Sequence, residues 1–293
     1  MSGLPDTAPA PLHLGRYSLP IRRRTLVMGI LNMTPDSFSG DGLGTDLDAA
    51  LARARAMAAY GADILDVGGM STRPGAEEIG EAEEMRRVLP LIRTLAAETD
   101  LPISVDTYRT AVAAAALDAG AVIVNDITGL HAEPDLAEAV AAHGAALVLM
   151  HIKGTPRTMQ ENPHYTDLIG EIRAYLQEGL ERALAAGVGR DRIWADPGIG
   201  FGKTIHHNLE ILRRLGELGS LGVPLLVGTS RKAFIGRILS GRPPEERVSG
   251  TAATIALSIA HGADIVRVHD VASAVDVARI ADAIVRGWDE PPV

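Results

Sequence analysis

Polar residues that could do chemistry recur at one kind of position in this sequence, directly after short apolar runs. Read along the chain, they are Asn32, Ser71-Thr72-Arg73, Asp106, Asn125-Asp126, His151, Asp196, Ser230-Arg231-Lys232, Arg267 and His269. The cations offer positive charge and forked donors that suit a phosphate or a diphosphate. The carboxylates and amides offer acceptors that suit a planar heterocycle with several N–H donors along one edge. Because buried carboxylates are costly unless paired, such an edge or a lysine must satisfy them. The set predicts a pocket with one acidic and one basic half.

Each of these residues also has an ordinary structural interpretation. Asp106 precedes a helical segment and could be its N-cap, and Asn125-Asp126 could cap a turn in the same way. Lys232 could be a surface lysine near a helix start. We expect His151 to be a structural donor rather than a base, and His206-His207 to lie on the solvated surface.

Metal-ligand patterns are scarce in the sequence. It contains no H-E-x-x-H motif and no carboxylate cluster with metal spacing, so a metal cage built from protein ligands alone is not expected. A Mg²⁺ held partly by substrate phosphates stays open, because that ion keeps few protein ligands.

The stretch ADPGIGFGKT (195–204) is similar to two phosphate-binding loops but matches neither. Pro197 stands where G-x-x-x-x-G-K-[ST] needs its first glycine, and Lys203 stands where G-x-G-x-x-G needs its third. What remains is Asp196, a carboxylate that ends an apolar run just before a flexible turn.

Composition and charge exclude several classes of protein. The chain has 293 residues, 46% of them apolar, and no cysteine, which excludes disulfides, thiolate nucleophiles and Cys-ligated zinc. A formal net charge of −9 argues against general nucleic-acid binding, which leaves a basic footprint. Residues 1–20 are Pro-rich and lack a long apolar stretch, and no apolar run reaches membrane-spanning length. We therefore expect a cytoplasmic protein with no signal peptide and no membrane partner.

Strands and helices alternate along the chain in a way that positions the polar residues. The predicted strands are 26–31, 63–67, 102–105, 121–124, 145–150, 192–195, 224–227 and 264–268, and the predicted helices include 46–60, 81–98, 107–119 and 165–186. Eight such units in about 250 residues are typical of a single-domain (β/α)8 TIM barrel, whose chemistry gathers at the C-terminal strand ends. A doubly wound open sheet is the alternative. Loops 34–45, 71–80 and 153–163 are rich in Gly, Pro, Ser and Thr, as active-site rims are.

Eight sequence blocks identify a resemblance to a known family. They are MGILNMTPDSFSGDG (28–42), DVGGMSTRPGA (66–76), SVDTYR (104–109), VNDITGL (124–130), LMHIKGTPRTMQ (149–160), ADPGIGFGK (195–203), VGTSRKAFIG (227–236) and RVHDV (267–271). In this order they resemble dihydropteroate synthase. The resemblance implies a barrel, usually a homodimer, that joins p-aminobenzoate to 6-hydroxymethyl-7,8-dihydropterin diphosphate, releases diphosphate and forms dihydropteroate in folate synthesis. It implies an extension over 1–20 and a pterin-binding catalytic domain over 21–293.

The resemblance also assigns roles, motif by motif. It places pterin contacts on Asp106, Asn125, Asp196 and Lys232, and diphosphate contacts on Asn32, Thr72, Arg73, Arg267 and His269. It places the p-aminobenzoate and sulfonamide side on Thr72, Pro74, Phe201, Ser230 and Lys232, and a Mg²⁺ cofactor on Asn32. The residues expected to serve catalysis are Asp106, Lys232, Arg267 and His269.

Two departures and three rival functions remain. Met70 stands where many members have glutamate, and the first loop reads SGDGL rather than the commoner SDGG, which leaves the role of Asp41 open. The rivals are a Schiff-base aldolase that uses Lys232, a pterin-binding methyltransferase of related fold, and a catalytically silent paralogue that only binds pterin or phosphate. The methyltransferase would not need the STRP loop, and the intact segment 32–38 weighs against the silent paralogue.

Overall fold

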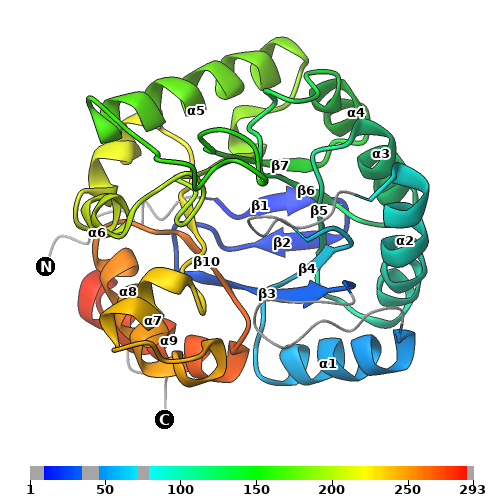
Figure 1. Cartoon of the computed structure of the whole chain (residues 1–293). Helices are drawn as coiled ribbons and strands as arrows, with labels where there is room; N and C mark the ends of the chain where they lie inside the picture. Colours follow the sequence, from blue (N-terminus) through cyan, green and yellow to red (C-terminus); the bar gives the residue numbers. More distant parts are fainter. Residues whose placement is uncertain (1–9, 35–45, 72–78, 289–293) are drawn as a thin grey trace, which may run out of the picture.

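The computed structural model describes residues 10–34, 46–71 and 79–288 of the chain. Within these residues, eight parallel strands form one sheet in the order β8-β7-β6-β5-β4-β3-β10-β9. The sheet closes between its first and last strands, where the Ala195 N–H donates to the Pro224 carbonyl at 2.9 Å and Ala195 bridges Leu225. Helices surround the closed sheet as an outer ring (Figure 1). The predicted (β/α)8 barrel is confirmed, and the open-sheet alternative is wrong.

The barrel strands lie close to their predicted positions. They are β3 (Leu26–Asn32), β4 (Ile64–Gly68), β5 (Ile103–Asp106), β6 (Ile123–Asp126), β7 (Ala146–Met150), β8 (Ile193–Asp196), β9 (Leu226–Val227) and β10 (Ile265–Val268). In four of them the last residue is a polar one, which the sequence analysis had placed just past the strand. Strand side chains alternate between the two faces of the sheet. When the last polar residue belongs to the strand, its side chain therefore has a defined face, either towards the barrel interior or towards the helices.

The helices follow the strands in order. They are α1 (Leu47–Ala59), α2 (Glu81–Glu98), α3 (Thr110–Asp118), α4 (Leu136–Ala142), α5 (Leu168–Ala185), α6 (Ile205–Arg213), α7 (Ala233–Ile238), α8 (Val248–Ala260) and α9 (Val271–Arg286), with 3-10 turns η1 (Arg190–Arg192), η2 (Leu215–Leu221) and η3 (Pro244–Glu246). Side-chain caps fix several starts: Asp46 accepts from the Ala49 N–H, and Asp167 from the Gly170 N–H. α5 therefore begins three residues after the predicted Tyr165.

The start of α3 corrects one structural interpretation. The helix begins at Thr110 with Arg109 as its N-cap, not at Thr107, because Thr107 donates its N–H to the Asn125 carbonyl at 3.1 Å. Asp106 is therefore not a helix cap. Its carboxylate faces the other way, into the barrel, where Arg267 binds it.

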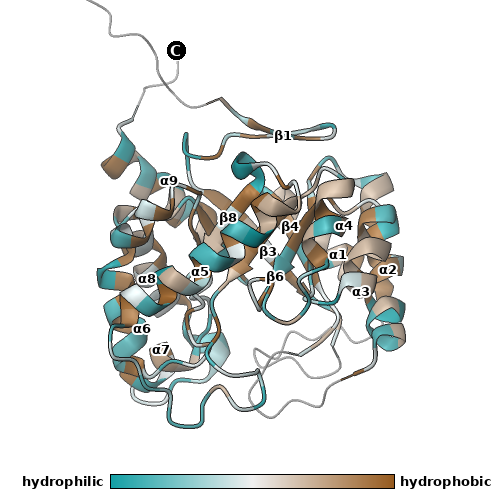
Figure 2. Ribbon diagram, turned by 90° about the horizontal axis from the view of Figure 1, so that it is seen from above, coloured by the Kyte–Doolittle hydropathy of each residue, from teal (hydrophilic) through white to brown (hydrophobic). Residues whose placement is uncertain are grey.

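Two apolar clusters form the core. The larger one fills the space between the sheet and the helices. The smaller one fills the barrel interior and includes Met28, Ile64, Val148 and Trp194. It also includes leucines of an antiparallel hairpin, β1 (Leu12–Leu14) and β2 (Tyr17–Leu19), which lies across one end of the barrel (Figure 2). The hairpin closes the N-terminal end, so the opposite end is left for a site.

Candidate active site

A cavity of about 610 Å³ lies at the C-terminal ends of the strands. Every described residue with a predicted site role lines it: Asn32, Asp106, Asn125, Asp196, Phe201, Ser230, Lys232, Arg267 and His269. Met70 and Ser71 line it too, whereas Thr72, Arg73, Pro74 and Asp41 lie outside the described residues. The volume suits a small-molecule ligand.

Strand register explains why these side chains converge. Asn32 pairs with Gly68, Gly68 with Asp106, and Asp106 with Asn125, so the three polar residues share one level of the barrel and one inward parity. A Cβ at Gly68 would lie 3.6 Å from Asn32 Oδ1 and 3.7 Å from Asp106 Oδ2. The glycine therefore leaves a methyl-sized gap between an amide and a carboxylate.

Arg267 joins two carboxylates at the base of the cavity. Its Nε donates to Asp66 Oδ2 and its Nη2 to Asp106 Oδ2, each at 2.6 Å. Burial alone would lower the pKa of Arg267, but the attraction of Asp66 and Asp106 outweighs it and raises the pKa. Burial raises the pKa of Asp106 to about 7 even though Arg267 opposes that shift. Arg267 is thus permanently charged. It lines the cavity and also binds the carboxylates of Asp66 and Asp106.

Asp196 and Lys232 are a second pair of opposite charges in the pocket. Asp196 Oδ1 accepts from the Gly198 N–H at 2.6 Å, which turns the chain after β8. Burial raises the pKa of Asp196, with the Gly198 bond and Lys232 opposing. Burial also lowers the pKa of Lys232 to about 8, against the attraction of Asp196. Lys232 Nζ lies 4.3 Å from the centroid of the Phe201 ring, so the lysine is held over an aromatic face. It is not the surface lysine of the alternative interpretation.

Ser230 and His269 meet where the ends of β9 and β10 adjoin. The His269 N–H donates to Ser230 Oγ at 3.1 Å, and His269 Nδ1 lies 2.9 Å from the same oxygen. The Ser230 hydroxyl oxygen therefore contacts both the backbone and the ring of His269. That arrangement fixes the ring orientation of His269 at the rim of the cavity.

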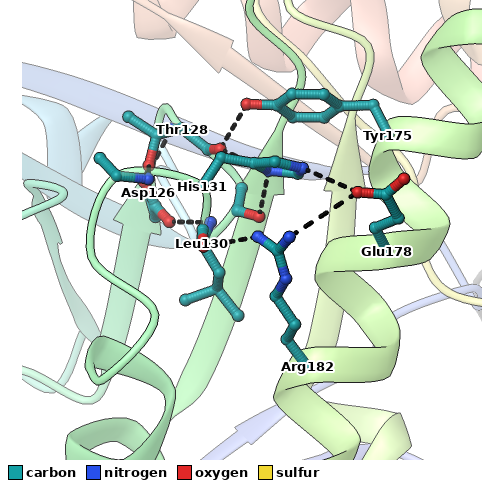
Figure 3. A network of polar contacts seen from close by, with 9 residues as sticks. Asp126, Thr128, Leu130, His131, Tyr175, Glu178 and Arg182 are labelled. Atoms are coloured by element: carbon teal, nitrogen blue, oxygen red, sulfur yellow. Dashed lines mark hydrogen bonds and ion pairs between the residues drawn. The ribbon is translucent and has the colours of Figure 1, made fainter.

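Asp126 does cap a turn, as its structural interpretation held. Its carboxylate accepts from the N–H and Oγ of Thr128 and from the Leu130 N–H, at 2.6–2.8 Å. Figure 3 shows how this turn continues outward, through Tyr175 and His131, to Glu178 and Arg182 on α5. Asp126 does not line the cavity, in contrast to its neighbour Asn125.

Two predictions about histidines can be refined. His151 is buried and structural, but its Nδ1 lies 2.8 Å from Lys203 Nζ, and burial lowers the pKa of His151 to about 2. Burial therefore favours the neutral ring, which shares a hydrogen bond with Lys203. His206 is exposed, whereas His207 forms a capping box with Thr204 at the start of α6.

Sequence reasoning missed two buried charged residues of the site. Asp66 lies inside β4, is fully buried and binds Arg267. Its position two residues before Gly68 gives it the same inward parity as the site, a signal that the alternation rule could have supplied. Lys203 lines the cavity although it follows the β8 strand end by seven residues, because the glycine turn folds back. No simple sequence pattern would have revealed it.

The closed parallel barrel with a polar cavity at its C-terminal end defines the class of protein, a TIM-barrel enzyme. The family model described as pterin binding enzyme matches residues 28–269. The dihydropteroate synthase of Synechocystis sp. is 50% identical over 283 residues, 97% of this chain and 98% of that protein. The Bacillus subtilis enzyme is 47% identical over 273 residues, 93% of each.

Solved structures of dihydropteroate synthases are similar to this chain over most of its length. A Yersinia pestis dihydropteroate synthase in a sulfonamide drug complex gives a TM-score of 0.90 at 44% identity, covering 94% of this chain and 98% of that one. A Xanthomonas albilineans dihydropteroate synthase in complex with 7,8-dihydropteroate gives 0.78 at 40% identity, covering 89% and 93%. The chain belongs to the dihydropteroate synthases, a family of pterin-binding transferases.

Proposed function

We propose that this chain joins p-aminobenzoate to 6-hydroxymethyl-7,8-dihydropterin diphosphate, forming 7,8-dihydropteroate and diphosphate. The observation that carries the proposal is the two-sided cavity. Acceptors at the ends of β5, β6 and β8 share one space of about 610 Å³ with Lys232, Arg267 and His269, which come from β10 and from the segments after β9 and β10. This division suits a substrate that has an N–H-rich ring at one end and a diphosphate at the other.

The pterin ring is assigned to the acidic half. Asp196 and Asn125 are buried, so a ring edge with N–H donors would supply the partners that burial otherwise removes. Asp106 and Lys232 are assigned to the pterin as well. Asp106 is assigned to the methylene group that reacts. Lys232 offers a donor to a ring acceptor.

The diphosphate is assigned to the basic half. Arg267 and His269 line it, and Thr72 and Arg73 are assigned there by the family motif, though they lie outside the described residues. In the ligand-free chain the Arg267 Nε and Nη2 atoms bind Asp66 and Asp106, which leaves Nη1 for an incoming phosphate oxygen. A preorganised cation such as Arg267, and hydrogen-bond donors beside it, stabilise a leaving group as its charge develops.

Mg²⁺ is the proposed cofactor, with Asn32 as its protein ligand. In the described part of the chain no group of three His, Asp or Glu residues could hold a metal. A Mg²⁺ ion fits nonetheless, because it keeps most of its waters and takes phosphate oxygens, and the Asn32 side chain lines the cavity. When bound, the ion would add positive charge beside the departing diphosphate.

The proposed reaction exchanges a C–O bond for a C–N bond. The bond between the pterin methylene carbon and the diphosphate oxygen breaks, and its electron pair leaves with the diphosphate, which Arg267 and His269 hold. Donation from the reduced ring and the Asp106 carboxylate stabilise the positive charge on the methylene. The lone pair of the p-aminobenzoate nitrogen forms the new C–N bond, and that nitrogen then loses a proton to water. Positioning supplies much of the remaining acceleration.

The second substrate is assigned to the side formed by Phe201, Ser230 and Lys232, with Thr72 and Pro74 of the loop outside the described residues. The Phe201 ring already lies against Lys232 Nζ, so an aromatic acid there would have both a ring face and a cation. Sulfonamides would compete for this side.

Direct turnover tests the function. Purified protein, both substrates and Mg²⁺ should give 7,8-dihydropteroate, identified by mass spectrometry, and one diphosphate per product. Binding of pterin diphosphate without product would mean a silent paralogue. The Asp106→Asn variant is the matched control, because it removes the charge beside the methylene but keeps the size of the side chain.

We also propose a homodimer. Five large apolar side chains on α8, α9 and the residues after α9 are exposed, at 55% for Leu257, 65% for Ile280, 79% for Ile284, 47% for Val285 and 68% for Trp288. Such a patch on adjacent helices is typical of an association surface. Light scattering should give twice the chain mass of 30.8 kDa, and Ile284→Asp should give a monomer. A monomeric wild type would contradict the proposal.

A further inference from the structure

All three lysines of the chain gather around one turn. Lys153, Lys203 and Lys232 are the only lysines in the sequence. Lys203 and Lys232 line the cavity, and a Cβ at Gly202 would lie 2.8 Å from the Cβ of Lys153. Of the three, only Lys232 has a role in the proposed reaction. The buried Lys203 therefore needs an explanation.

Lys203 is held by two acceptors. The residue is 3% exposed, and its Nζ donates to the Phe201 carbonyl at 2.9 Å and lies 2.8 Å from His151 Nδ1. Burial lowers the pKa of His151 to about 2 and also lowers the pKa of Lys203, so the neutral form of each is favoured and the two share a hydrogen bond. The lysine thus ties the turn after β8 to the residue that follows β7.

The turn that Lys203 holds is rich in glycine and is restrained by side chains on several sides, among them Gln160 and Tyr165, which donate to the Gly200 and Gly202 carbonyls. Gly198, Gly200 and Gly202 alternate along it with φ of 69°, 85° and 66°, a region that glycine enters without strain. Side chains also bind two of the glycine N–H groups: Asp196 binds the Gly198 N–H and Asn208 binds the Gly200 N–H. At Phe201 itself, Lys203 is the side chain that binds the backbone carbonyl.

Phe201 in turn contacts Lys232. The Lys232 ammonium lies 4.3 Å from the ring centroid, and a Cβ at Gly200 would lie 3.3 Å from Lys232 Cδ. A shift of the turn would therefore move both the aromatic wall and the cation on the second-substrate side. The chain of contacts runs from His151 through Lys203 and Phe201 to Lys232.

We propose that Lys203 is a positioning residue that sets the place of Phe201, and through it the binding of p-aminobenzoate. The inference rests on the proposed function for the name of that substrate. Lys203 is not proposed to touch the reacting atoms. Its loss should therefore raise the KM for p-aminobenzoate more than it changes kcat or the affinity for the pterin.

A double-mutant cycle tests the route through Phe201. Lys203→Met should raise the KM for p-aminobenzoate about tenfold, the cost of a lost buried hydrogen bond, and change the Kd of the hydroxymethyl pterin alcohol less than about threefold. In a Phe201→Ala background the same substitution should leave that KM nearly unchanged. An equal effect in both backgrounds, or equal losses for both ligands, would overturn the proposal.

Two variants of His151 test the same proposal if Lys203→Met folds poorly. His151→Asn retains an acceptor oxygen near the Nδ1 position, whereas His151→Leu removes it, and neither changes the charge. His151→Leu should reproduce the KM effect and His151→Asn should rescue it. Equal behaviour of the two variants would contradict the role of the Lys203 anchor.

Amide hydrogen exchange tests the role of Lys203 without a measurement of enzyme turnover. In the ligand-free protein, Lys203→Met should speed exchange of the 198–202 amides about tenfold, since a restraint on the turn is lost. His206→Ala is the control, because it changes an exposed residue of the following helix α6. Unchanged exchange in Lys203→Met would overturn this inference alone, whereas an inactive wild type would overturn the proposed function alone.

Discussion

At the scale of single residues, the pocket depends on two groups that titrate near neutrality. Burial raises the pKa of Asp106 to about 7 and lowers the pKa of Lys232 to about 8. Asp106 is ionised above its pKa, and Lys232 is ionised below its own. Both charges coexist most fully between about pH 7 and 8, where a carboxylate and an ammonium are both available to the pterin ring.

This gives a pH prediction. Affinity for the hydroxymethyl pterin alcohol, which has no titrating phosphate, should be greatest between about pH 7 and 8 and should fall on either side, by up to about tenfold per pH unit. In Lys232→Met the alkaline fall should vanish and the acid fall should remain. Isothermal calorimetry across pH 5–10 measures both limbs. A flat profile from pH 5 to 10 would show that neither group is coupled to the ligand.

The sequence predicted most of the described site residues, because they stand at strand ends and share one inward parity. For Asp106, the sequence predicted a place at a strand end in the pocket, but it did not predict the ion pair with Arg267. The ion pair joins residues 161 positions apart, and a single sequence does not show which cation lies opposite which carboxylate. Asp66 was missed for a related reason, since a buried carboxylate inside a strand is only tolerable with that distant arginine.

At the scale of elements, the turn between β6 and α4 is built on one buried carboxylate. Asp126 is 1% exposed and accepts from two backbone N–H groups and one hydroxyl. The Tyr175 hydroxyl on α5 donates to the Thr128 carbonyl at 2.5 Å, and the His131 ring stacks on Tyr175 at 3.7 Å. This turn holds the end of β6, and thus Asn125, in register (Figure 3).

Asp126→Ala should therefore destabilise the protein. Two buried N–H groups would lose their acceptor, at a cost of about 1–3 kcal/mol each in free energy of unfolding. Urea denaturation measures the change. Asp135→Ala, which alters an exposed aspartate of the same connection that caps nothing with its side chain, is the control and should change stability little. Equal stability of the two variants would mean that water replaces the carboxylate.

Element boundaries were predicted within about three residues, and the misses have local causes. α2 begins and ends where its charge and apolar pattern predicted. α3 begins late because the Thr107 N–H is bound by the neighbouring strand β6, a tertiary contact that propensity does not contain. The hairpin β1–β2 was not predicted at all, since its two short strands pair only over the barrel end.

At the scale of the whole molecule, the hairpin forms the floor of the barrel. Leu14 is fully buried and Leu19 is 4% exposed, and both pack with barrel-interior residues such as Met28 and Trp194. The same interior continues upward to the layer of Asp66 and Arg267. The floor and the site are thus two ends of one packed column.

Leu14→Ala should lower the free energy of unfolding by about 2–5 kcal/mol, as expected for a large-to-small change in a core. His13→Ala changes the adjacent exposed residue of the same strand and should stay within about 0.5 kcal/mol of the wild type. Thermal and urea denaturation compare the two variants. A Leu14→Ala protein as stable as His13→Ala would show that the hairpin does not contribute to the barrel core.

The central claim is that one cavity binds a pterin by its acidic half and a diphosphate by its basic half. Asp196→Asn and Arg267→Lys test it together. Asparagine keeps an acceptor for the Gly198 N–H but turns the other oxygen into a donor, and lysine keeps a charge for Asp66 and Asp106 but loses the guanidinium fork.

The measurement is calorimetric binding of the pterin diphosphate and of its alcohol, with Mg²⁺, to the wild type and both variants. Asp196→Asn should weaken both ligands alike, by about 1.5–3 kcal/mol. Arg267→Lys should weaken the diphosphate about tenfold or more and the alcohol less than about threefold. Equal losses of both ligands in Arg267→Lys would contradict the account, because Arg267 would then serve only the carboxylates beneath the pterin.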